Sequence, residues 1–392
     1  MKILHTADWH LGKTFLGENL LQDQKHVLDQ LVAYVEAHRP QVLLLAGDVY
    51  DRSVPPTEAV RLFDEALSKI ILEYKTPVIA IAGNHDSPER LHFGAYLLQK
   101  QGLHIRGSLE LPLAPVILAD DQGEVYFYPL PYTEPETLRY VLSRTYPQEP
   151  LPVIETHADV MRWIVNHIQA HHPAGKRAVF VGHAYIAEAQ GEDSDSERQL
   201  SVGGAALVPA EVFDFFDYTA LGHLHKPLSF GGGKVKYSGA LLKYSFSEAD
   251  YEKSVLLIDL PLQNPLQAER LPLRPRRQVR RVEGYIENRT FCLQDAAELP
   301  QTEDYLEVRL HNVQVVPNAM PIIKQQYPNA LSLRWVKLPE LRPQNQLDTA
   351  QISQMSPVDL FADFYHHFTG QALDNAKKQV LEEIAKDLQQ QS

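Results

Sequence analysis

The chain has 392 residues, 44% of them hydrophobic, which is enough to bury a substantial core and to build two or three domains. Its net charge of −13 weighs against nucleic-acid binding by the surface as a whole, so any such binding must come from a local basic cluster. The single cysteine, Cys292, excludes an internal disulfide framework, and no apolar run approaches the roughly 20 residues of a membrane span. We expect a globular, cytoplasmic protein.

The first part of the chain repeats a strand, a polar loop and a helix three times. Apolar runs at 2–5, 42–46 and 77–82 predict strands that are buried on both faces of a sheet. A helical period of apolar residues follows each run, and the first such helix spans 19–39 before Pro40. Repeated βα units indicate a layered α/β domain.

From residue 115 the pattern changes to that of antiparallel strands. The runs 115–119 and 124–130 flank a turn and predict a hairpin. Further strands are expected at 178–182 and 218–222, and the last strands of this domain at 234–239 and 254–260. The polar segment 191–204, between two of these strands, has the composition of a solvated surface loop.

Side chains that can bind metal ions follow one predicted strand after another. They are Asp8, His10, Asp48, Asn84, His85, His183, His223 and His225. Open α/β sheets bind their ligands at the carboxyl ends of the strands, so we expect these loops to converge. GNHD at 83–86 and GHLH at 222–225 are specific as motifs, whereas His183 taken alone is equally well explained as a core histidine.

The residue types indicate the chemistry. Imidazole, carboxylate and amide oxygen suit borderline divalent ions such as Mn²⁺, and the absence of a cysteine cluster argues against structural zinc. Two ions about 3.5 to 4 Å apart share a bridging carboxylate and act together on a phosphoryl centre. We expect Asp48 to be that carboxylate, and a histidine beside the ions to protonate the leaving group.

After residue 262 the composition shifts to Pro, Gln and Arg, and we interpret 263–281 as a linker. Its basic cluster is predicted to contact DNA phosphates, although a solvated spacer between two domains is an equal alternative. The cluster comprises Arg274, Arg276, Arg277, Arg280 and Arg281. Residues 282–341 then predict a small α/β accessory domain.

The last residues, 342–392, read as a polar tether followed by two amphipathic helices. The first helix carries apolar residues at Leu360, Phe361, Phe364 and Phe368, and the second at Leu373, Val380, Leu381, Ile384 and Leu388. Each of these apolar stripes must pack against another part of the chain or against a partner. The helices either fold back on the preceding domains or, as the tether favours, bind a helical partner.

The segments TADWHLG, GDVYDR, GNHD, VGH and GHLH resemble, in this order and spacing, the five motifs of calcineurin-like metallophosphoesterases over about residues 1–260. SDSERQLSVGG, LPY at 130–132 and KYSGALLKYSFSE resemble more narrowly the SbcD nuclease subunits of bacterial SbcCD complexes, and this likeness spans essentially the whole chain. It outweighs the reading of the polar insertion as a mere surface loop. It implies an α/β, four-layer sandwich of two mixed sheets flanked by helices for 1–262, followed by a DNA-capping domain.

The resemblance also implies which residues hold two divalent ions, with Mn²⁺ preferred and Mg²⁺ possible. One ion would be bound by Asp8, His10, Asp48 and His225, and the other by Asp48, Asn84, His183 and His223. His85 would be the non-ligating histidine that stabilises or protonates the leaving group. Archaeal and eukaryotic relatives often carry a histidine three residues after the bridging aspartate, where this chain has Asp51.

The implied enzyme is an ATP-dependent 3′–5′ double-strand exonuclease and single-strand endonuclease that cleaves DNA ends and hairpins in recombination, replication and repair. Its partner would be an SMC-like ATPase of the SbcC type, bound by the C-terminal helices, with a homodimer inside a nucleoid-associated heterotetramer. The motifs alone leave open a phosphomonoesterase or a cyclic-nucleotide phosphodiesterase of the same superfamily. A non-catalytic scaffold is opposed by the complete set of ligands.

Overall fold

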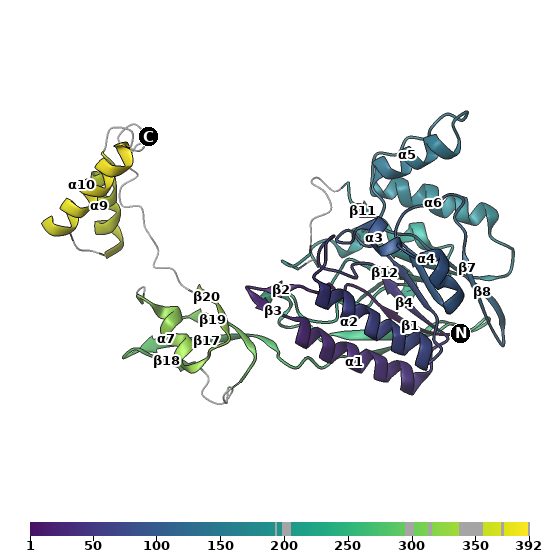
Figure 1. Cartoon of the computed structure of the whole chain (residues 1–392), viewed down its shortest axis with the longest axis horizontal. Coiled ribbons are helices and arrows are strands. Elements are labelled where there is room, and N and C mark those ends of the chain that lie inside the picture. Colours follow the sequence, from purple (N-terminus) through teal and green to yellow (C-terminus); the bar gives the residue numbers. More distant parts are fainter. Residues whose placement is uncertain are drawn as a thin grey trace. The chain divides into compact units, whose positions relative to one another are not determined.

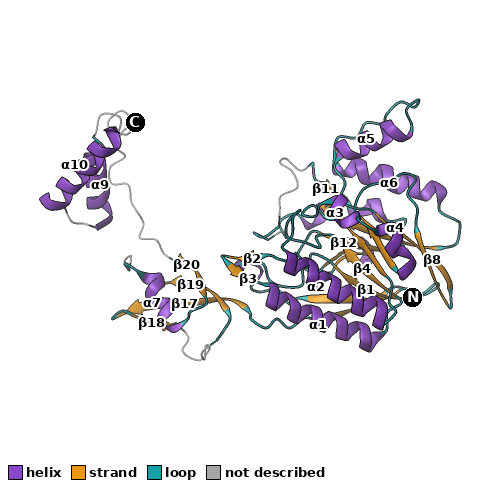
Figure 2. Ribbon diagram, in the orientation of Figure 1, coloured by secondary structure: helices purple, strands orange, loops and turns teal. Residues whose placement is uncertain are grey.

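Two six-stranded β-sheets with helices on their outer faces build the N-terminal part of the chain (Figures 1 and 2). A computed structural model describes residues 1–192, 194–197, 205–294, 302–312, 316–336, 356–369 and 372–390. The chain separates into two units, residues 1–336 and residues 337–392. No helix within these described ranges is long and apolar enough to cross a membrane.

The first sheet contains the strands of the repeated βα units. Its strand order is β16, β15, β1, β4, β5, β6, and the last four strands run parallel to one another. These strands are β1 (Lys2–Thr6), β4 (Val42–Ala46), β5 (Val78–Ile81), β6 (Leu103–Arg106), β15 (Ser254–Asp259) and β16 (Gln267–Pro272). Every residue of β4 is buried, as its uninterrupted apolar sequence predicts.

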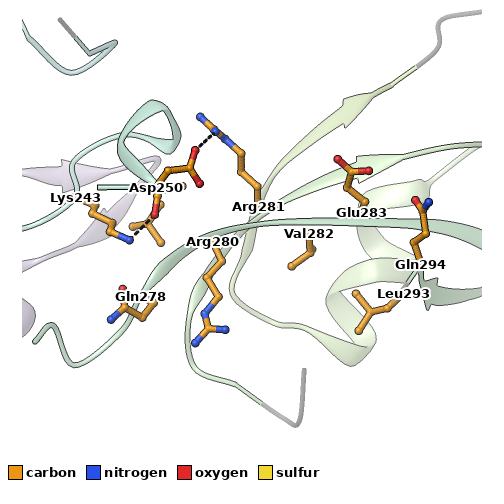
Figure 3. Close-up of a pocket in the computed structure, with 11 residues that line it drawn as sticks. Lys243, Asp250, Gln278, Arg280, Arg281, Val282, Glu283, Leu293 and Gln294 are labelled. Carbon is orange, nitrogen blue, oxygen red and sulfur yellow. Dashed lines mark hydrogen bonds and ion pairs between the residues drawn. The ribbon is translucent and has the colours of Figure 1, made fainter. Parts of the chain in front are cut away.

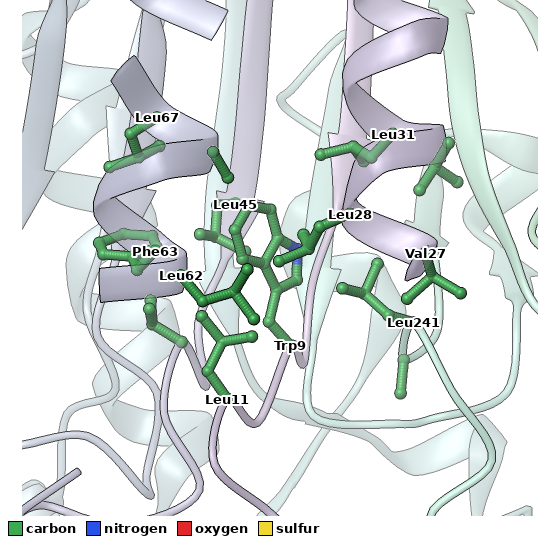
Figure 4. Packing of buried hydrophobic residues seen from close by; sticks show 14 of the residues in the cluster. Trp9, Leu11, Val27, Leu28, Leu31, Leu45, Leu62, Phe63, Leu67 and Leu241 are labelled. Carbon is green, nitrogen blue, oxygen red and sulfur yellow. The ribbon is translucent and has the colours of Figure 1, made fainter. Parts of the chain in front are cut away.

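Helices α1 (Leu21–His38) and α2 (Thr57–Ser68) cover the outer face of the first sheet. Trp9 is fully buried in this layer, among Leu28 of α1, Leu45 of β4 and Phe63 of α2 (Figure 4). Its indole Nε1 donates a hydrogen bond of 2.9 Å to Thr6 Oγ1. The buried ring thereby anchors the loop after β1.

The second sheet has the strand order β13, β14, β12, β9, β8, β7. Its strands are β7 (Val116–Asp120), β8 (Gly123–Pro129), β9 (Arg177–His183), β12 (Tyr218–Gly222), β13 (Leu228–Phe230) and β14 (Val235–Tyr237). Strands β7 and β8 form the predicted hairpin. Helices α5 (Pro135–Thr145) and α6 (His157–His171) pack on the outer face.

A third apolar cluster lies between the two sheets and holds them together. It includes Leu44 of β4, Ile79 of β5, Phe127 of β8 and Val179 of β9, all fully buried. The layers therefore follow the order helices, sheet, sheet, helices. This confirms the expected four-layer α/β sandwich.

Shorter elements fill the connections. They are β2 (Thr14–Phe15), β3 (Glu18–Asn19), α3 (Pro88–His92), α4 (Ala95–Leu98), β10 (Tyr185–Ile186), β11 (Leu207–Val208), the π-helical turn Lys69–Glu73, and the 3₁₀ turns Gln99–Gln101, Ala187–Ala189, Ala210–Phe213, Gly231–Gly233 and Phe246–Glu248.

The segment expected to be a linker, 263–281, contains regular structure, so that prediction needs correction. Strand β16 lies within it, at the edge of the first sheet, paired antiparallel with β15. At this edge every residue of β16 except Leu271 is exposed, so the strand lacks the apolar alternation by which strands are recognised. Its last residue is Pro272, and proline is tolerated in edge strands.

A third sheet, with the strand order β18, β17, β19, β20, forms the accessory part of the first unit. Its elements are β17 (Val279–Glu287), β18 (Thr290–Leu293), β19 (Tyr305–Leu310), α7 (Ala319–Gln326) and β20 (Ala330–Trp335). The predicted β-α-β pattern corresponds to β19, α7 and β20. Strand β17 begins inside the segment interpreted as a linker.

The second unit contains two helices, α9 (Pro357–Thr369) and α10 (Asn375–Gln390). Helix α9 begins at a side-chain cap, because the backbone N–H of Asp359 donates to Ser356 Oγ at 3.1 Å. Of the predicted tether, 342–356, only Ser356 lies within the described residues, and the side chains of Phe368, Ile384 and Leu388 lie outside them.

Candidate metal centre

The eight predicted site residues come together at one edge of the sandwich. Asp8 follows β1, Asp48 follows β4, and Asn84 and His85 follow β5. His183 ends β9, and His223 and His225 follow β12. The first three strands run parallel in one sheet and the other two run parallel in the second, so each sheet presents its carboxyl ends together.

Four of these residues have a left-handed backbone, which residues other than glycine rarely adopt. The φ angles are 53° at Asp8, 44° at His10, 49° at Asp48 and 105° at His223. Such strain persists where the surrounding structure enforces it, and it is concentrated at functional sites.

Two glycines allow the strand ends to approach closely. A Cβ atom on Gly83 would lie 2.1 Å from Asp48 Oδ1, and one on Gly222 would lie 1.9 Å from the carbonyl oxygen of Ala46. Any side chain at either position would force the loops apart. The glycines of the GNHD and GHLH motifs are therefore required by packing.

The Asp48 carboxylate lies between two imidazoles that come from different sheets. Its Oδ2 atom is 3.5 Å from His10 Nε2 and 3.6 Å from His183 Nε2. Its Oδ1 atom accepts a hydrogen bond of 2.9 Å from the backbone N–H of His85. This is the position a carboxylate shared between two ions needs.

On one side of Asp48, ligand atoms of Asp8, His10 and His225 all lie within 4.8 Å of one another. The Nε2 atoms of His10 and His225 are 3.1 Å apart. Two nitrogens that bind one ion at about 2.1 Å lie about 3 Å apart when their bonds are roughly perpendicular. Asp8 is held in place by the backbone N–H of His223, which donates to its Oδ1 at 3.0 Å.

On the other side, the ring of His183 is oriented by the backbone. Its Nδ1 donates to the carbonyl oxygen of Ala46 at 2.9 Å, which leaves the lone pair of Nε2 facing Asn84 Oδ1 at 2.9 Å. A nitrogen lone pair and an amide oxygen at this distance suit a cation between them. His223 lies beside His183, with ring centroids 5.4 Å apart.

The electrostatics of the site favour a cation. Burial, together with the nearby Asp48 carboxylate, raises the pKa of Asp8 well above its usual value. Burial also lowers the pKa of His10, His183 and His223, so these imidazoles are neutral, the form that binds metal. Buried carboxylates among neutral imidazoles fit divalent ions such as Mn²⁺.

His85 lies at the mouth of the site, partly buried, with its ring centroid 4.8 Å from that of His10. Its Nδ1 donates to the carbonyl oxygen of Asp51 at 3.0 Å. The Asp51 carboxylate accepts from Lys13 Nζ at 2.7 Å. His85 therefore has one nitrogen fixed and the other, Nε2, available.

Sequence reasoning missed Asp86, although it belongs to the GNHD motif. Its buried carboxylate accepts from the backbone N–H groups of Val49, Tyr50 and Gly83 at 2.9 to 3.0 Å, and so ties the loop after β4 to the loop after β5. Burial and the charge of Asp48 raise the pKa of Asp86 to about 7.

Sequence reasoning also missed the surroundings of His225. Ser196 and Glu197, in the polar insertion that reads as a surface loop, contact this histidine at 2.8 Å and 2.7 Å. Glu248, at the end of the KYSGALLKYSFSE segment, is fully buried with an oxygen 3.1 Å from His225 Nδ1. Only the family resemblance marked these segments in advance.

A four-layer sandwich with these side chains at its carboxyl edge defines a metal-dependent phosphoesterase. Residues 1–227 match the calcineurin-like phosphoesterase family, and residues 275–368 match a family described as the type 5 capsule protein repressor C-terminal domain. The SbcD subunit of the nuclease SbcCD from Staphylococcus saprophyticus is 33% identical over 384 residues, covering 98% of this chain and 97% of that protein. Its namesake from Staphylococcus epidermidis is 33% identical over 385 residues, covering 98% of each chain.

The chain therefore belongs to the calcineurin-like phosphoesterases and, within them, to the SbcD-type nuclease subunits. It is an enzyme of that type. Among solved structures, a dimetal phosphatase from Danio rerio covers 70% of this chain and 96% of its own at 12% identity, with a TM-score of 0.40.

Proposed function

We propose that this chain is the Mn²⁺-dependent DNA nuclease subunit of an SbcCD-type complex and hydrolyses DNA phosphodiesters by a two-metal mechanism. In the complex it would act as an ATP-dependent 3′–5′ double-strand exonuclease, a single-strand endonuclease and a hairpin-cleaving enzyme at the nucleoid. The observation that carries the proposal is the Asp48 carboxylate between His10 Nε2 and His183 Nε2, at 3.5 and 3.6 Å.

The residues divide into two sets around Asp48. Asp8, His10 and His225 would hold one ion, and Asn84, His183 and His223 the other. When bound, two such ions activate water and stabilise charge on an in-line phosphoryl centre. The chain contributes a rigid, water-poor cradle, since Asp8, His10, Asp48 and His183 are each at most 2% exposed.

His85 is the proposed acid for the leaving oxygen. The hydrogen bond from its Nδ1 to the Asp51 carbonyl fixes the ring, so that Nε2 can carry a proton toward the departing alkoxide. Asp51 stands where many relatives have a second histidine. In this chain its backbone oxygen orients His85 and its carboxylate pairs with Lys13.

A groove of about 590 Å³ with three basic side chains supports DNA binding (Figure 3). Its lining includes Lys243 of the sandwich, Arg280 and Arg281 of the third sheet, and the acidic Asp250 and Glu283. Basic side chains of this kind bind phosphates without reading sequence. We assign phosphate contacts to Arg280 and Arg281, together with the exposed Arg274 and Arg276, while Arg277 has a competing structural role.

Two apolar surfaces support the proposed partners. Helices α9 and α10 line a groove of about 450 Å³ with Phe361, Tyr365, Leu373, Val380 and Leu381, and we assign it to the helical SMC-like ATPase of the SbcC type.

The second apolar surface surrounds α4 in the first unit. Phe93 is 86% exposed and Leu97 79% exposed, with Tyr96 between them. Exposed apolar side chains gathered in one place mark an interface. We assign this surface to the homodimer contact.

One assay separates the proposed nuclease from a phosphomonoesterase or a cyclic-nucleotide phosphodiesterase. Purified protein is incubated with Mn²⁺ and, in parallel, with a DNA hairpin, p-nitrophenyl phosphate and a cyclic nucleotide, with Asp48→Asn as the control. Hairpin cleavage that EDTA and Asp48→Asn abolish supports the proposal. Turnover of the small esters without cleavage of DNA would refute it.

A further inference from the structure

A buried ion pair lies behind His225. Glu248 is fully buried, and the Lys253 side chain is 1% exposed. Lys253 Nζ donates to Glu248 Oε2 at 2.5 Å and to the backbone oxygen of His225 at 2.8 Å. Removing two charges from water is unfavourable, so such a pair needs a reason beyond the stability of the fold.

The second oxygen of Glu248 is directed to the histidine. Glu248 Oε1 lies 3.1 Å from His225 Nδ1 and accepts from the hydroxyls of Ser194 and Ser196 at 3.0 and 2.5 Å. Because the Ser196 hydroxyl donates its hydrogen bond to Glu248, its oxygen is left as an acceptor facing His225 Nδ1 at 2.8 Å. Nδ1 thus faces two acceptors and must carry the proton.

The backbone of His225 is fixed by the same group of residues. Its N–H donates to Glu197 Oε1 at 2.7 Å, and its carbonyl oxygen accepts from Lys253. The Lys253 ammonium, 2.5 Å from Glu248 Oε2, supplies the opposite charge that a buried carboxylate needs. A carboxylate paired in this way is a strong acceptor for the Nδ1 proton.

We propose that Glu248 is a positioning residue: by accepting the Nδ1 proton of His225, directly and through Ser196, it fixes the tautomer whose Nε2 lone pair faces His10. The Nε2 atoms of His225 and His10 are 3.1 Å apart, on the side of the site assigned to one ion. Residues 194–197 cover the carboxylate. This inference rests on the proposed metal site.

Carboxylates behind metal-binding histidines typically contribute 10- to 100-fold in metal affinity. Titration calorimetry of the full chain with Mn²⁺ tests the assignment. Wild type should bind two ions, and Glu248→Gln should bind one of them about 10- to 100-fold more weakly while keeping the other. The electron paramagnetic resonance signal of a coupled Mn²⁺ pair should weaken in the same variant.

Glu307→Gln is the matched control. This carboxylate is 1% exposed and pairs with Arg309 at 3.2 Å and Arg334 at 2.9 Å, in the third sheet. Its loss should lower the stability measured by unfolding in EDTA but leave both Mn²⁺ affinities unchanged. Equal Mn²⁺ binding by Glu248→Gln and wild type would overturn the inference.

A double-variant cycle asks whether Glu248 acts through His225. On a His225→Ala background, Glu248→Gln should cause no further loss of Mn²⁺ affinity, and an undiminished further loss would contradict the assignment. If Glu248→Gln fails to fold, Ser196→Ala tests the same contact and should weaken binding of the same ion. A wild-type chain that binds no Mn²⁺ would refute the metal site itself, which is a different outcome from two normal ions in Glu248→Gln.

Discussion

The guanidinium of Arg277 holds the carboxylate of Asp23, which lies 254 residues earlier in the chain, through two hydrogen bonds, one of them 3.1 Å long. Arg277 also lies over the ring of Tyr305, 4.4 Å from its centroid, and the Tyr305 hydroxyl donates to Asp23 at 3.3 Å. Helix α1 of the sandwich is thus tied to the start of the third sheet. Arg277 was predicted to bind phosphate, but in this position its guanidinium is already paired with the Asp23 carboxylate.

We therefore expect Arg277→Gln to destabilise the first unit. Asp23 is 2% exposed, and removing one member of a buried ion pair costs roughly 3 kcal/mol. Urea unfolding in EDTA measures this effect. The control is Arg276→Gln, whose half-exposed pair with Glu303 should contribute under about 1 kcal/mol. Equal midpoints for the two variants would contradict the structural role of Arg277.

The other arginines are expected to govern the salt dependence of DNA binding. Arg276 and Arg281 pair with the exposed carboxylates of Glu303 and Asp250, which phosphates can replace. Arg280 is half-exposed and pairs with Asp304, whose side chain is 12% exposed. Each phosphate contact contributes about 0.9 to the slope of log affinity against log salt concentration.

Changing Arg274, Arg276 and Arg280 together to Gln should therefore flatten that slope, by up to about 0.9 for each residue. Fluorescence anisotropy of duplex DNA at several salt concentrations gives the slope. Arg277→Gln should leave it unchanged. If the triple variant leaves the slope unaltered, the arginine segment is better explained as a spacer between two domains.

The layered core could be predicted because its signals are local. The apolar sequence of β4 and the helical period of α1 each indicate burial within a few residues, and the glycine of each motif directly precedes a candidate ligand in the chain. Strand β16 was missed because an edge strand with one buried residue has no such pattern.

The convergence of the candidate ligands could be predicted for a related reason. Asp8 and Asp48 each follow a strand and His183 ends one, and the sequence reveals the direction of these strands. The supporting contacts could not be predicted, because they join residues distant in the chain: Glu248 reaches His225 from a short turn 23 residues later, and Arg277 contacts Asp23, which lies 254 residues earlier. Nothing local marks such contacts.

The roles of His85 and Asp48 are separable by metal binding. His85→Ala should lower the rate of hairpin cleavage by roughly 10²- to 10⁴-fold, because one proton donor is removed, while both Mn²⁺ ions stay bound. Asp48→Asn should lose an ion, because the carboxylate between the two imidazoles is gone. Calorimetry and cleavage rates are measured on the same samples, with His38→Ala at the end of α1 as the control. If His85→Ala lost an ion, His85 would be a metal ligand rather than the proton donor.

Stability should fall in mild acid, partly because of His5. Burial lowers the pKa of His5 from 6.5 to about 3, and its Nδ1 lies 2.8 Å from the Tyr218 hydroxyl. Below pH 6.5 the unfolded chain binds a proton at His5 that the folded chain does not, so this contribution to stability is complete above pH 6.5 and is lost as the pH falls toward 3.

His5→Gln should therefore reduce the slope of unfolding free energy against pH, between pH 4 and 6, by up to about 1.4 kcal/mol per pH unit. Urea unfolding in EDTA provides the slope. Tyr218→Phe keeps the imidazole and should retain the wild-type slope. A slope that His5→Gln leaves intact would mean that His5 does not titrate in this way.

The C-terminal helices are expected to be dispensable for chemistry and essential for assembly. Phe361 and Val380 line the groove between α9 and α10 and are 43% and 55% exposed, so an apolar surface remains for a partner to cover. Deleting 345–392 should leave Mn²⁺-dependent cleavage of single-stranded DNA intact, because the metal centre lies wholly within the first unit. The deletion should abolish co-purification with the SMC-like ATPase, and with it any ATP-stimulated degradation of duplex ends.

Phe361→Glu with Val380→Glu should reproduce this loss, whereas Glu382→Lys, at an exposed position of α10, should not. If the truncated chain unfolds or loses its cleavage of single strands, the helices belong to the nuclease core.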